Sequence, residues 1–488
     1  MDKGVAAMIT FIGSILFLII GYVIYGKVVE RIFGIDDKQE TPAYSKQDGL
    51  DFVPMKWWKG SLIQLLNIAG TGPIFGAILG ALYGPVAFIW IVVGCIFAGA
   101  VHDYFSGMMS LRHGGAQFPT LVGKYLGKYA KFLITIISII LMILVAAAFT
   151  AAPAQLVSSI TPLSFTACLL IVFVYLLLSA ILPVDKIIGR LYPFFGAILI
   201  FMAVSIGIGM FFFETPIPNL TLSNLHPGDM PIWPLLMVTI SCGAISGFHS
   251  TQSPIISRTL KKESEGRKVF YGAMVAEGVI ALIWAAAGMT FFGNTGGLQE
   301  ALAAGGPGAV VNEISISTLG TFGGILAILG IIVLPITTGD TALRSSRMML
   351  ADILRQITKK DLKKKGTQAL LIIPVALPML FLSMIDYNFL WRYVGWTNQV
   401  VATVMLWTGT MYLVKNYKFH WICSIPALFM TAVVCSYVFY APEGFNMDYG
   451  ISMILGSILW VVVAIWFVSR LIKQKKLKNS EISVTRAS

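Results

Sequence analysis

Charged residues are scarce in this sequence. Only 12% of the 488 residues are Asp, Glu, Lys or Arg, about half the share found in a typical soluble protein. Hydrophobic residues make up 57%, and the mean hydropathy is +0.81. Apolar runs near the roughly 20 residues that cross a bilayer recur along the whole chain. The composition therefore predicts an all-α polytopic membrane protein and excludes a soluble fold.

Two kinds of chemical motif are also missing. The five cysteines lie scattered in apolar segments without a Cys-x-x-Cys pair, so we interpret them as packing residues rather than a disulfide or metal framework. Gly70 and Gly72 superficially resemble a phosphate-binding loop, but no Lys-Ser/Thr follows them and no strand precedes them. We therefore expect no metal, no cofactor and no nucleotide-driven pump.

The positions of the basic residues predict the topology. The apolar runs predict about thirteen transmembrane helices, at residues 4–25, 58–83, 85–110, 131–152, 164–183, 191–213, 233–257, 270–292, 320–344, 369–385, 397–414, 420–440 and 450–470. With the N-terminus outside, every Lys and Arg except Lys3 and Arg392 falls on one side. By the positive-inside rule that side, with the C-terminus, is cytoplasmic. The net charge of +12 thus reports topology and not a nucleic-acid partner.

The second apolar run contains a stretch that a regular membrane helix should not have, NIAGTGPIFG. Residues 69–73 of this stretch lie about 11 residues, or roughly 16 Å, from the inner end of the span, close to the membrane midplane. Pro73 cannot donate to the preceding turn but is suited to begin a helix. We predict that one half-helix ends near Ala69 and another begins at Pro73, so that the amides of residues 71–74 face the membrane centre. A simple kink is the alternative.

The seventh apolar run carries a second break, SCGAISGFHSTQSP at residues 241–254, again about halfway through the membrane. The second run crosses from inside to outside and the seventh from outside to inside. Equivalent breaks five spans apart in opposite directions are expected of a five-plus-five inverted repeat, with the binding site where the breaks meet. We expect a substrate carboxylate to bind there. The predicted substrate-binding residues are Gly70, Thr71, Gly72, Pro73, Ser246, His249 and Gln252. For His249, proton handling and a structural hydrogen bond inside the bundle are the alternatives.

The inverted repeat also divides the chain. The first five-helix repeat is predicted at 58–213 and the second at 233–414. Residues 1–57 would be a peripheral helix with a cytoplasmic loop, and 420–488 two peripheral helices with a basic cytoplasmic tail. The longest hydrophilic stretches, 26–57 and 293–319, are predicted to be loops. Glycines spaced by four in the second span are interpreted as a close-packing stripe rather than ligand contacts: Gly72, Gly76, Gly80 and Gly84.

A few ionisable residues lie at membrane depth. His102 and Asp103 are neighbours in the third span and are candidates for a proton relay, although a buried pair that braces the helix is the alternative. Glu277 in the eighth span and Gln252 in the seventh are further polar residues at depth, and for either one a packing hydrogen bond is the alternative to a functional role. Asp340 and Arg344 in the ninth are spaced i, i+4 and could pair on one helix face.

Four stretches together resemble the carbon starvation protein A family of bacterial inner-membrane transporters: NIAGTGPIFG, GPVAFIWIVVGCIFAGAVHDYFSGMMSLRHGG, SCGAISGFHSTQSP and TTGDTALRSSR. The resemblance covers roughly residues 58–350. It implies similarity to the amino acid–polyamine–organocation superfamily and hence the LeuT-type five-plus-five repeat. It also implies uptake of peptides during carbon starvation, or of pyruvate coupled to protons. The chain is short for this family, so the substrate need not carry over.

The resemblance also implies a place for the coupling ion. In LeuT-type transporters the third helix of the second repeat, here the ninth span, supplies oxygen ligands beside the first broken helix. The predicted coupling residues, for H⁺ or Na⁺, are Ile68, Ala69, Thr337, Thr338 and Asp340.

We therefore predict a secondary transporter, not an enzyme, that imports a peptide or pyruvate across the bacterial inner membrane. Its partners would be this small-molecule substrate and the lipid bilayer. A channel would need a continuous polar lining, whereas the polar residues here cluster at two breaks. A membrane-embedded enzyme would need a nucleophile–base or metal constellation, which only Ser and His near residue 249 faintly offer. Substrate counterflow would distinguish a carrier from a channel.

Overall fold

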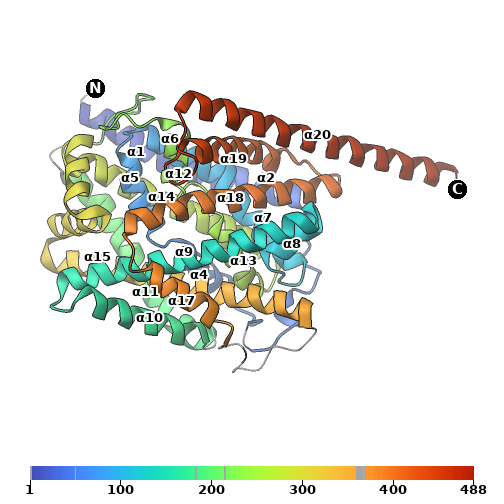
Figure 1. Ribbon diagram of the computed structural model, residues 1–488, viewed down its shortest axis with the longest axis horizontal. Helices are drawn as coiled ribbons and strands as arrows, with labels where there is room; N and C mark the ends of the chain where they lie inside the picture. The colour runs from blue at the N-terminus through green and yellow to red at the C-terminus, as the bar shows by residue number, and fades with distance from the viewer. Residues whose placement is uncertain are drawn as a thin grey trace.

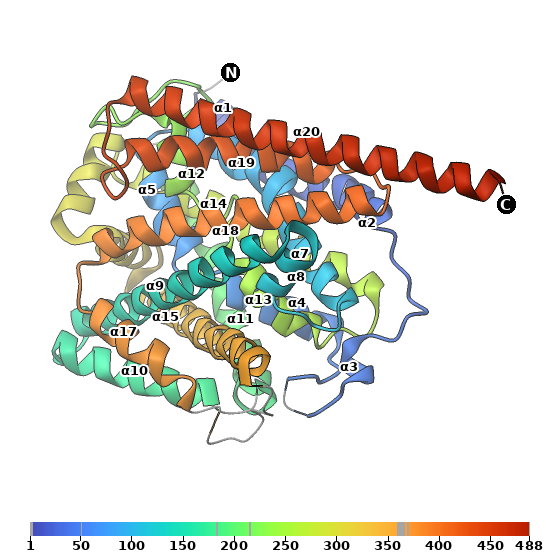
Figure 2. The same ribbon diagram turned by 45° about the vertical axis from the view of Figure 1, so that its right-hand side comes forward.

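The computed structural model describes residues 3–49, 51–181, 184–213, 216–358, 367 and 370–487. Within these residues all regular secondary structure is helical, as the composition predicts. Many helices run along the long axis of the molecule, and the two termini lie toward opposite ends of it (Figure 1). The last helix, α20 (Tyr449–Ala487), extends beyond the other helices, as the turned view also shows (Figure 2).

Each predicted span from 4–25 to 191–213 contains helix in the first half. The helices at Gly26–Phe33 and Pro42–Ser45, however, lie in the predicted loop 26–57, and the helix at Phe118–Leu126 lies between two predicted spans. In chain order the helices of this half are α1 (Lys3–Ile20), η1 (Gly21–Tyr25), α2 (Gly26–Phe33), α3 (Pro42–Ser45), α4 (Trp57–Ile68), η2 (Gly72–Gly76), α5 (Ala77–Ala81), α6 (Val86–Gly94), η3 (Cys95–Gly99), α7 (Ala100–Arg112), α8 (Phe118–Leu126), α9 (Lys128–Ile160), α10 (Phe165–Ile181), α11 (Val184–Gly209) and η4 (Met210–Phe212). The first helix continues through η1 and α2 past the predicted boundary at residue 25. It ends at Gly34, which caps the helix in the left-handed conformation with a φ of 70°.

The second half contains the second broken span and the longest helix. Its helices are α12 (Ile232–Thr239), α13 (Phe248–Ser257), η5 (Glu263–Glu265), η6 (Arg267–Tyr271), α14 (Gly272–Phe291), α15 (Thr295–Thr358), α17 (Ile373–Leu382), α18 (Tyr387–Lys415), α19 (Trp421–Tyr440) and α20. The prediction of a loop at 293–319 is wrong for most of that stretch, because α15 begins at Thr295. Gly306 and Gly320 interrupt α15 with φ values of 70° and 66°, a conformation that glycine adopts without steric cost.

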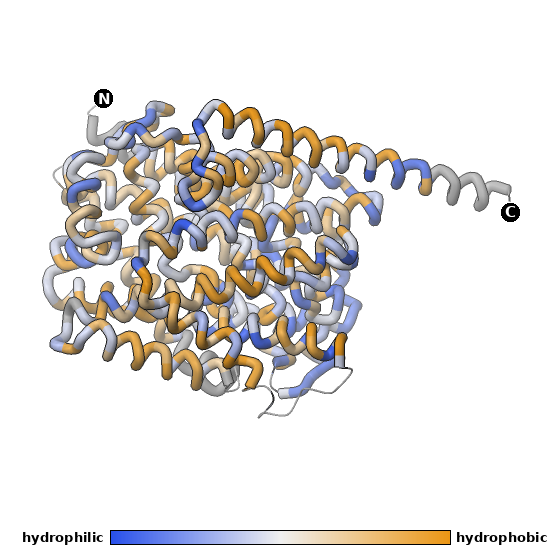
Figure 3. Tube along the Cα trace, in the orientation of Figure 1, coloured by the Kyte–Doolittle hydropathy of each residue, from blue (hydrophilic) through white to orange (hydrophobic). Residues whose placement is uncertain are grey.

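Length and hydropathy together separate the predicted spans. Within the part of the chain that the structure describes, the helices of spans 233–257 and 397–414, namely α12, α13 and α18, are not among those long and apolar enough to cross a membrane. Among the described residues, eight helices are long and apolar enough to cross a membrane, or nine if α4 and η2–α5 form one bent span. The helices α10 and α17 are apolar but shorter, and residues 182, 183 and 369 of these two predicted spans lie outside the described residues. Apolar residues dominate most helices, while hydrophilic residues gather mainly at connections and helix ends (Figure 3).

Burial distinguishes central from outer helices. In the most apolar window of each span, 83% of the residues are buried in the helix that contains α14 and 78% in the run from α6 to α7. The corresponding shares are 22% for the first helix and 17% for α20. The central helices α7 and α14 therefore pack against protein on nearly all sides. α7 packs along α13, the second half of the broken seventh span, and α14 approaches α13 at Glu277.

Candidate functional site

The second span is broken at the place that its sequence predicts. α4 ends at Ile68, Ala69 leaves the helical region with φ −79° and ψ 61°, and the new helix begins at Gly72 with Pro73 in its first turn. The two halves are bent by 58°. The amides of Ile74 and Phe75 donate to the Thr71 carbonyl and are therefore not free to bind an anion. Pro73 has no N–H group. Of the amides of residues 71–74, those of Thr71 and Gly72 remain as the predicted anion-binding groups.

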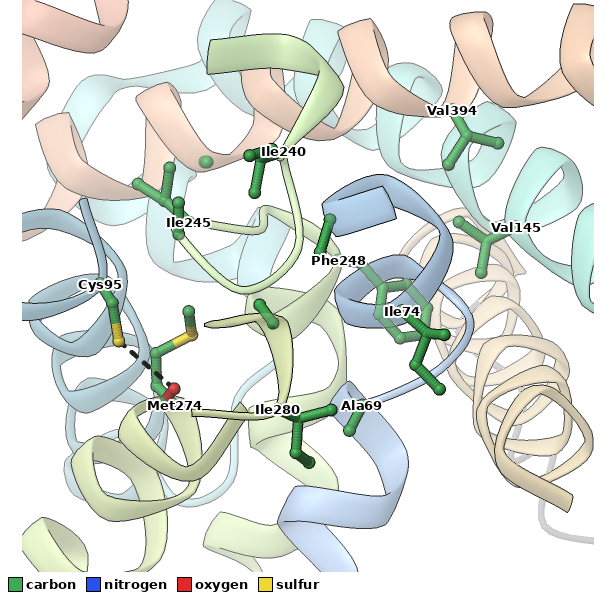
Figure 4. Packing of buried hydrophobic residues seen from close by; sticks show 14 of the residues in the cluster. Ala69, Ile74, Cys95, Val145, Ile240, Ile245, Phe248, Met274, Ile280 and Val394 are labelled. Carbon is green, nitrogen blue, oxygen red and sulfur yellow. Dashed lines mark hydrogen bonds between the residues drawn. The ribbon is translucent and has the colours of Figure 1, made fainter. Parts of the chain in front are cut away.

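The two breaks lie directly against each other. A Cβ atom at Gly72 would overlap the Cβ and Sγ atoms of Cys242, and one at Gly243 would lie 3.9 Å from the Pro73 Cα atom. Apolar side chains from both segments fill the space around this contact (Figure 4). The approach needs glycine at both positions, because Gly243 also has a φ of 90°. The prediction that the two breaks meet is confirmed by this contact.

Aromatic side chains from α18 border the first break. The Thr71 hydroxyl lies 3.2 Å from the Tyr387 hydroxyl in a buried hydrogen bond. Tyr387 stacks on Trp391 at 5.8 Å with an interplanar angle of 14°, and it meets the Phe75 ring edge-on. The sequence does not reveal this role of Tyr387, since the residue lies 316 positions from Thr71. In the sequence, Tyr387 falls in the connection between the predicted spans 369–385 and 397–414, so no signal pointed to it.

The second break is held in shape by Asn398 of α18. The Phe248 amide donates to Asn398 Oδ1 at 2.7 Å, which satisfies an amide at the start of α13. Ser246 Oγ and the Asn398 side-chain amide also contact each other, at 3.1 and 3.2 Å. Ser246, predicted to contact substrate, thus has a protein partner, and Asn398 is a residue of the site that sequence reasoning missed.

His249 lies in a buried group of ionisable side chains. Its Nδ1 atom is 2.9 Å from Asp103 Oδ2, and its Nε2 atom is 3.4 Å from Glu277 Oε2. His102 Nδ1 is 2.8 Å from Asp103 Oδ1. All four residues are completely buried. The structure therefore joins His102 and Asp103, the proton-relay candidates, to His249, which was predicted to contact substrate, and to Glu277.

Gln252 lies further along α13 and is not part of this group. Its side-chain amide donates to the Thr251 hydroxyl at 3.1 Å and contacts Met142 Sδ of α9 at 3.9 Å. These contacts place Gln252 between α13 and α9. Its role in substrate binding stays a prediction.

The predicted coupling residues divide between two environments. The hydroxyl of Thr337 donates to the Leu66 carbonyl at 2.9 Å, and that of Thr338 lies 3.5 Å from the same oxygen. Both threonines thus reach the end of α4, two residues before Ile68 and the break. Asp340 instead pairs with Arg344 at 3.8 Å, and Arg344 donates to a carbonyl of α10. Asp340 therefore lies on the side of α15 that faces α10.

Two hollows approach the breaks without reaching them. One of about 630 Å³ is lined by Phe75, Tyr387 and the segment 302–309. Another of about 1030 Å³ is lined by charged side chains that include Asp48, Arg258 and Asp352; by the predicted topology it opens to the cytoplasm. Because the residues at the breaks are buried, the arrangement is closed on both sides. At the first break, the Thr71 and Gly72 amides could bind an anion. Beside the second break, the ionisable side chains around His249 could bind a proton.

Sequence comparison places the chain among transport proteins. The family profile described as carbon starvation protein CstA matches residues 6–168, 151–290 and 285–436. An uncharacterised membrane protein of Haemophilus influenzae is 48% identical over 61% of this chain and 95% of its own length. The peptide transporter CstA of Bacillus subtilis is 25% identical over 95% of this chain and 97% of that protein. The pyruvate/proton symporter BtsT of Escherichia coli is 23% identical, over 57% of this chain and 48% of that protein.

Structural comparison identifies the fold. A Na⁺-coupled sialic acid symporter superposes with a TM-score of 0.57 over 94% of this chain and 96% of that one. The nucleobase-cation-symport transporter Mhp1 gives 0.52 over 89% and 96%, and MhsT in complex with L-phenylalanine gives 0.53 over 85% and 99%. Sequence identity is 14% in each case, so these matches speak only to the fold. The predicted LeuT-type fold is confirmed.

Proposed function

The chain belongs to the carbon starvation protein CstA family, and from this premise we propose that it imports a small nutrient bearing a carboxylate, a short peptide or pyruvate, together with a proton. By family and fold it is a secondary transporter in a membrane. The relatives named as peptide transporter and as pyruvate/proton symporter support these two substrate classes, and the second supports the proton. We place it in the bacterial inner membrane with the N-terminus outside.

The contact between the two breaks carries the proposal. At the first break the Thr71 and Gly72 amides stand at the positive end of a half-helix, where a carboxylate is favoured. The Thr71 and Tyr387 hydroxyls lie at the same place. Both breaks are buried, so binding there takes place away from bulk water, where such hydrogen bonds are stronger. A carboxylate is the group that peptides and pyruvate share.

Movement of the two repeats around this contact would open it to one side at a time. The hollow beside Tyr387 and the charged hollow beside Arg258 are the two routes that we propose for entry and release. The hydroxyls of Thr337 and Thr338, which hold α15 against the end of α4, would move with this break. If sodium replaces the proton as the coupling ion, these oxygens are the proposed ligands.

Transport by purified protein in proteoliposomes tests the proposal. We expect labelled pyruvate or dialanine to accumulate under an inward proton gradient, and to exchange in counterflow. Gly72→Val should abolish uptake, since a side chain there overlaps Cys242. Gly13→Val is the matched control, because a Cβ at Gly13 meets no atom within 4 Å. Failure of both compounds to move, or normal affinity in Gly72→Val, would overturn the proposal.

A further inference from the structure

We propose that the coupling proton binds between His249 of α13 and Glu277 of α14, with Asp103 of α7 as the residue that orients the histidine. This inference rests on the proposed function, because it names the site at which the proton of a symporter is held. It assigns to His249 proton binding in place of contact with the substrate.

Hydrogen bonding fixes the orientation of the His249 ring. Asp103 faces two ring nitrogens, His249 Nδ1 at 2.9 Å and His102 Nδ1 at 2.8 Å. An ionised carboxylate can only accept hydrogen bonds, so both Nδ1 atoms act as N–H donors. The remaining nitrogen of His249, Nε2, lies 3.4 Å from Glu277 Oε2, and among the described residues neither atom has a hydrogen-bond partner. This arrangement sets a basic nitrogen and a carboxylate face to face.

The facing pair requires a proton. Without one, a nitrogen lone pair would meet a charged carboxylate in a site that is completely buried, and such an unpaired buried charge is costly. One proton removes the conflict whether it is held by His249 Nε2 or by Glu277. The two carboxylates and two neutral imidazoles carry a formal charge of −2, and the added proton reduces this to −1. The pair is therefore a site whose charge depends on one exchangeable proton.

Nearby residues supply no other positive charge. Among the described residues, the ion pairs of His102, Asp103, His249 and Glu277 join only these four to one another. The further titratable groups that face Glu277 are the thiols of Cys95 on η3 and of Cys242 in the second break. Neither thiol contributes a positive charge when it titrates. A proton is thus the cation that this site is built to take.

The proton site is mechanically connected to the breaks. His249 is the second residue of α13, and the preceding residue, Phe248, donates its amide to Asn398. Glu277 lies beside the break itself: a Cβ at its neighbour Gly278 would be 3.3 Å from the Gly243 carbonyl. Loss of the proton leaves Asp103 of α7 and Glu277 of α14 as unscreened like charges beside the two nitrogens of His249. Binding or loss of the proton is therefore expected to change the position of the second break, whose residues Cys242 and Gly243 contact Gly72 and Pro73.

Glu277→Gln is the primary test, since it keeps the shape of the side chain and removes the titratable proton. In proteoliposomes, accumulation of labelled pyruvate or dialanine under an inward proton gradient should fall at least 10-fold, while counterflow exchange stays within about 3-fold of wild type. The pH dependence of exchange should flatten. Glu313→Gln, at an exposed position of α15, is the matched control and should behave as wild type. Full proton-driven accumulation in Glu277→Gln would overturn the inference.

A substrate-independent measurement separates this inference from the proposed function. If wild-type protein transports neither compound, the proposed substrate class fails, but the proton site can still be read by pH-difference infrared spectroscopy of the purified protein. We expect the carbonyl stretch of a titrating buried carboxyl group, present in wild type and Glu313→Gln and lost in Glu277→Gln. Should Glu277→Gln fail to fold, His249→Gln replaces it and should shift the same band. A wild-type spectrum in which neither a carboxyl carbonyl band nor a histidine ring band titrates, or one in which the titrating band persists in Glu277→Gln, overturns the site.

Discussion

Asn398→Ala tests whether the shape of the second break controls substrate affinity. The substitution removes the acceptor of the Phe248 amide, bonded at 2.7 Å, and the partner of Ser246. All of these groups are buried. A buried amide left without a partner costs about 1–3 kcal/mol. The variant should therefore disfavour the conformation in which the two breaks meet.

The magnitude follows from a population argument. A cost of about 2 kcal/mol to the binding-competent conformation lowers its population, and with it the apparent affinity, by roughly 30-fold, since 1.4 kcal/mol corresponds to a factor of ten. We expect the KM of uptake in proteoliposomes to rise by about this factor, with a lower Tm in detergent. Asn416→Ala, at the exposed end of the same helix, should leave both unchanged. A KM within 3-fold of wild type for Asn398→Ala would refute the reasoning.

Three further substitutions probe the surroundings of the first break. Tyr387→Phe removes the hydroxyl that contacts Thr71 and should raise the KM about 5-fold, for a loss near 1 kcal/mol, in an uptake assay. Thr337→Val keeps the shape of the side chain but loses the hydrogen bond to the Leu66 carbonyl; it should lower the Tm in detergent and reduce any stimulation of uptake by sodium. Asp340→Asn should retain proton-driven accumulation, measured against counterflow, because this carboxylate faces α10 rather than the break.

Matched variants make these outcomes interpretable. Tyr393→Phe changes a partly exposed tyrosine of the same helix, and Thr318→Val removes a hydroxyl that bonds only within its own helix, to the Ile314 carbonyl. Neither should alter transport. Equal effects of Thr318→Val and Thr337→Val would contradict the role given to the α4–α15 contact. Loss of accumulation with normal exchange in Asp340→Asn would move the coupling site from α13 and α14 to α15.

The local features of the fold could be predicted because they depend on residues close in sequence. Gly72 and Pro73 lie next to each other in an apolar run and predict by themselves that the helix is interrupted there. The glycines and proline of residues 241–254 predict the second break in the same way. Spacing and direction then predict that the breaks meet. The stretch 293–319 was mistaken for a loop because it is hydrophilic, whereas the chain from Thr295 to residue 319 is helical except at Gly306.

The partners of the polar residues could not be predicted, because they lie far away in the chain. His102 is adjacent to Asp103 and was paired with it from sequence, but His249 is 146 positions from that carboxylate. Asn398 is 150 positions from the Phe248 amide that it caps. Hydropathy identifies such residues as polar groups at depth and says nothing of which pairs meet. Packing of α7, α13, α14 and α18 decides this.

The glycine stripe of the second span has a consequence for how sequence variation in this protein should be interpreted. A Cβ atom added at Gly76 would lie only 3.0 Å from the Thr239 carbonyl oxygen, and one added at Gly80 would overlap the Ile240 side chain. A side chain at Gly76 or Gly80 would push the end of α12 away from the second span, and one at Gly72 would push away Cys242 of the second break. A comprehensive mutational scan would therefore find these positions as intolerant as residues that touch substrate. Transport activity divided by the amount of folded protein in the membrane would distinguish the two roles. It falls when a substrate contact is lost, and it stays constant when a helix–helix contact is lost and less protein folds.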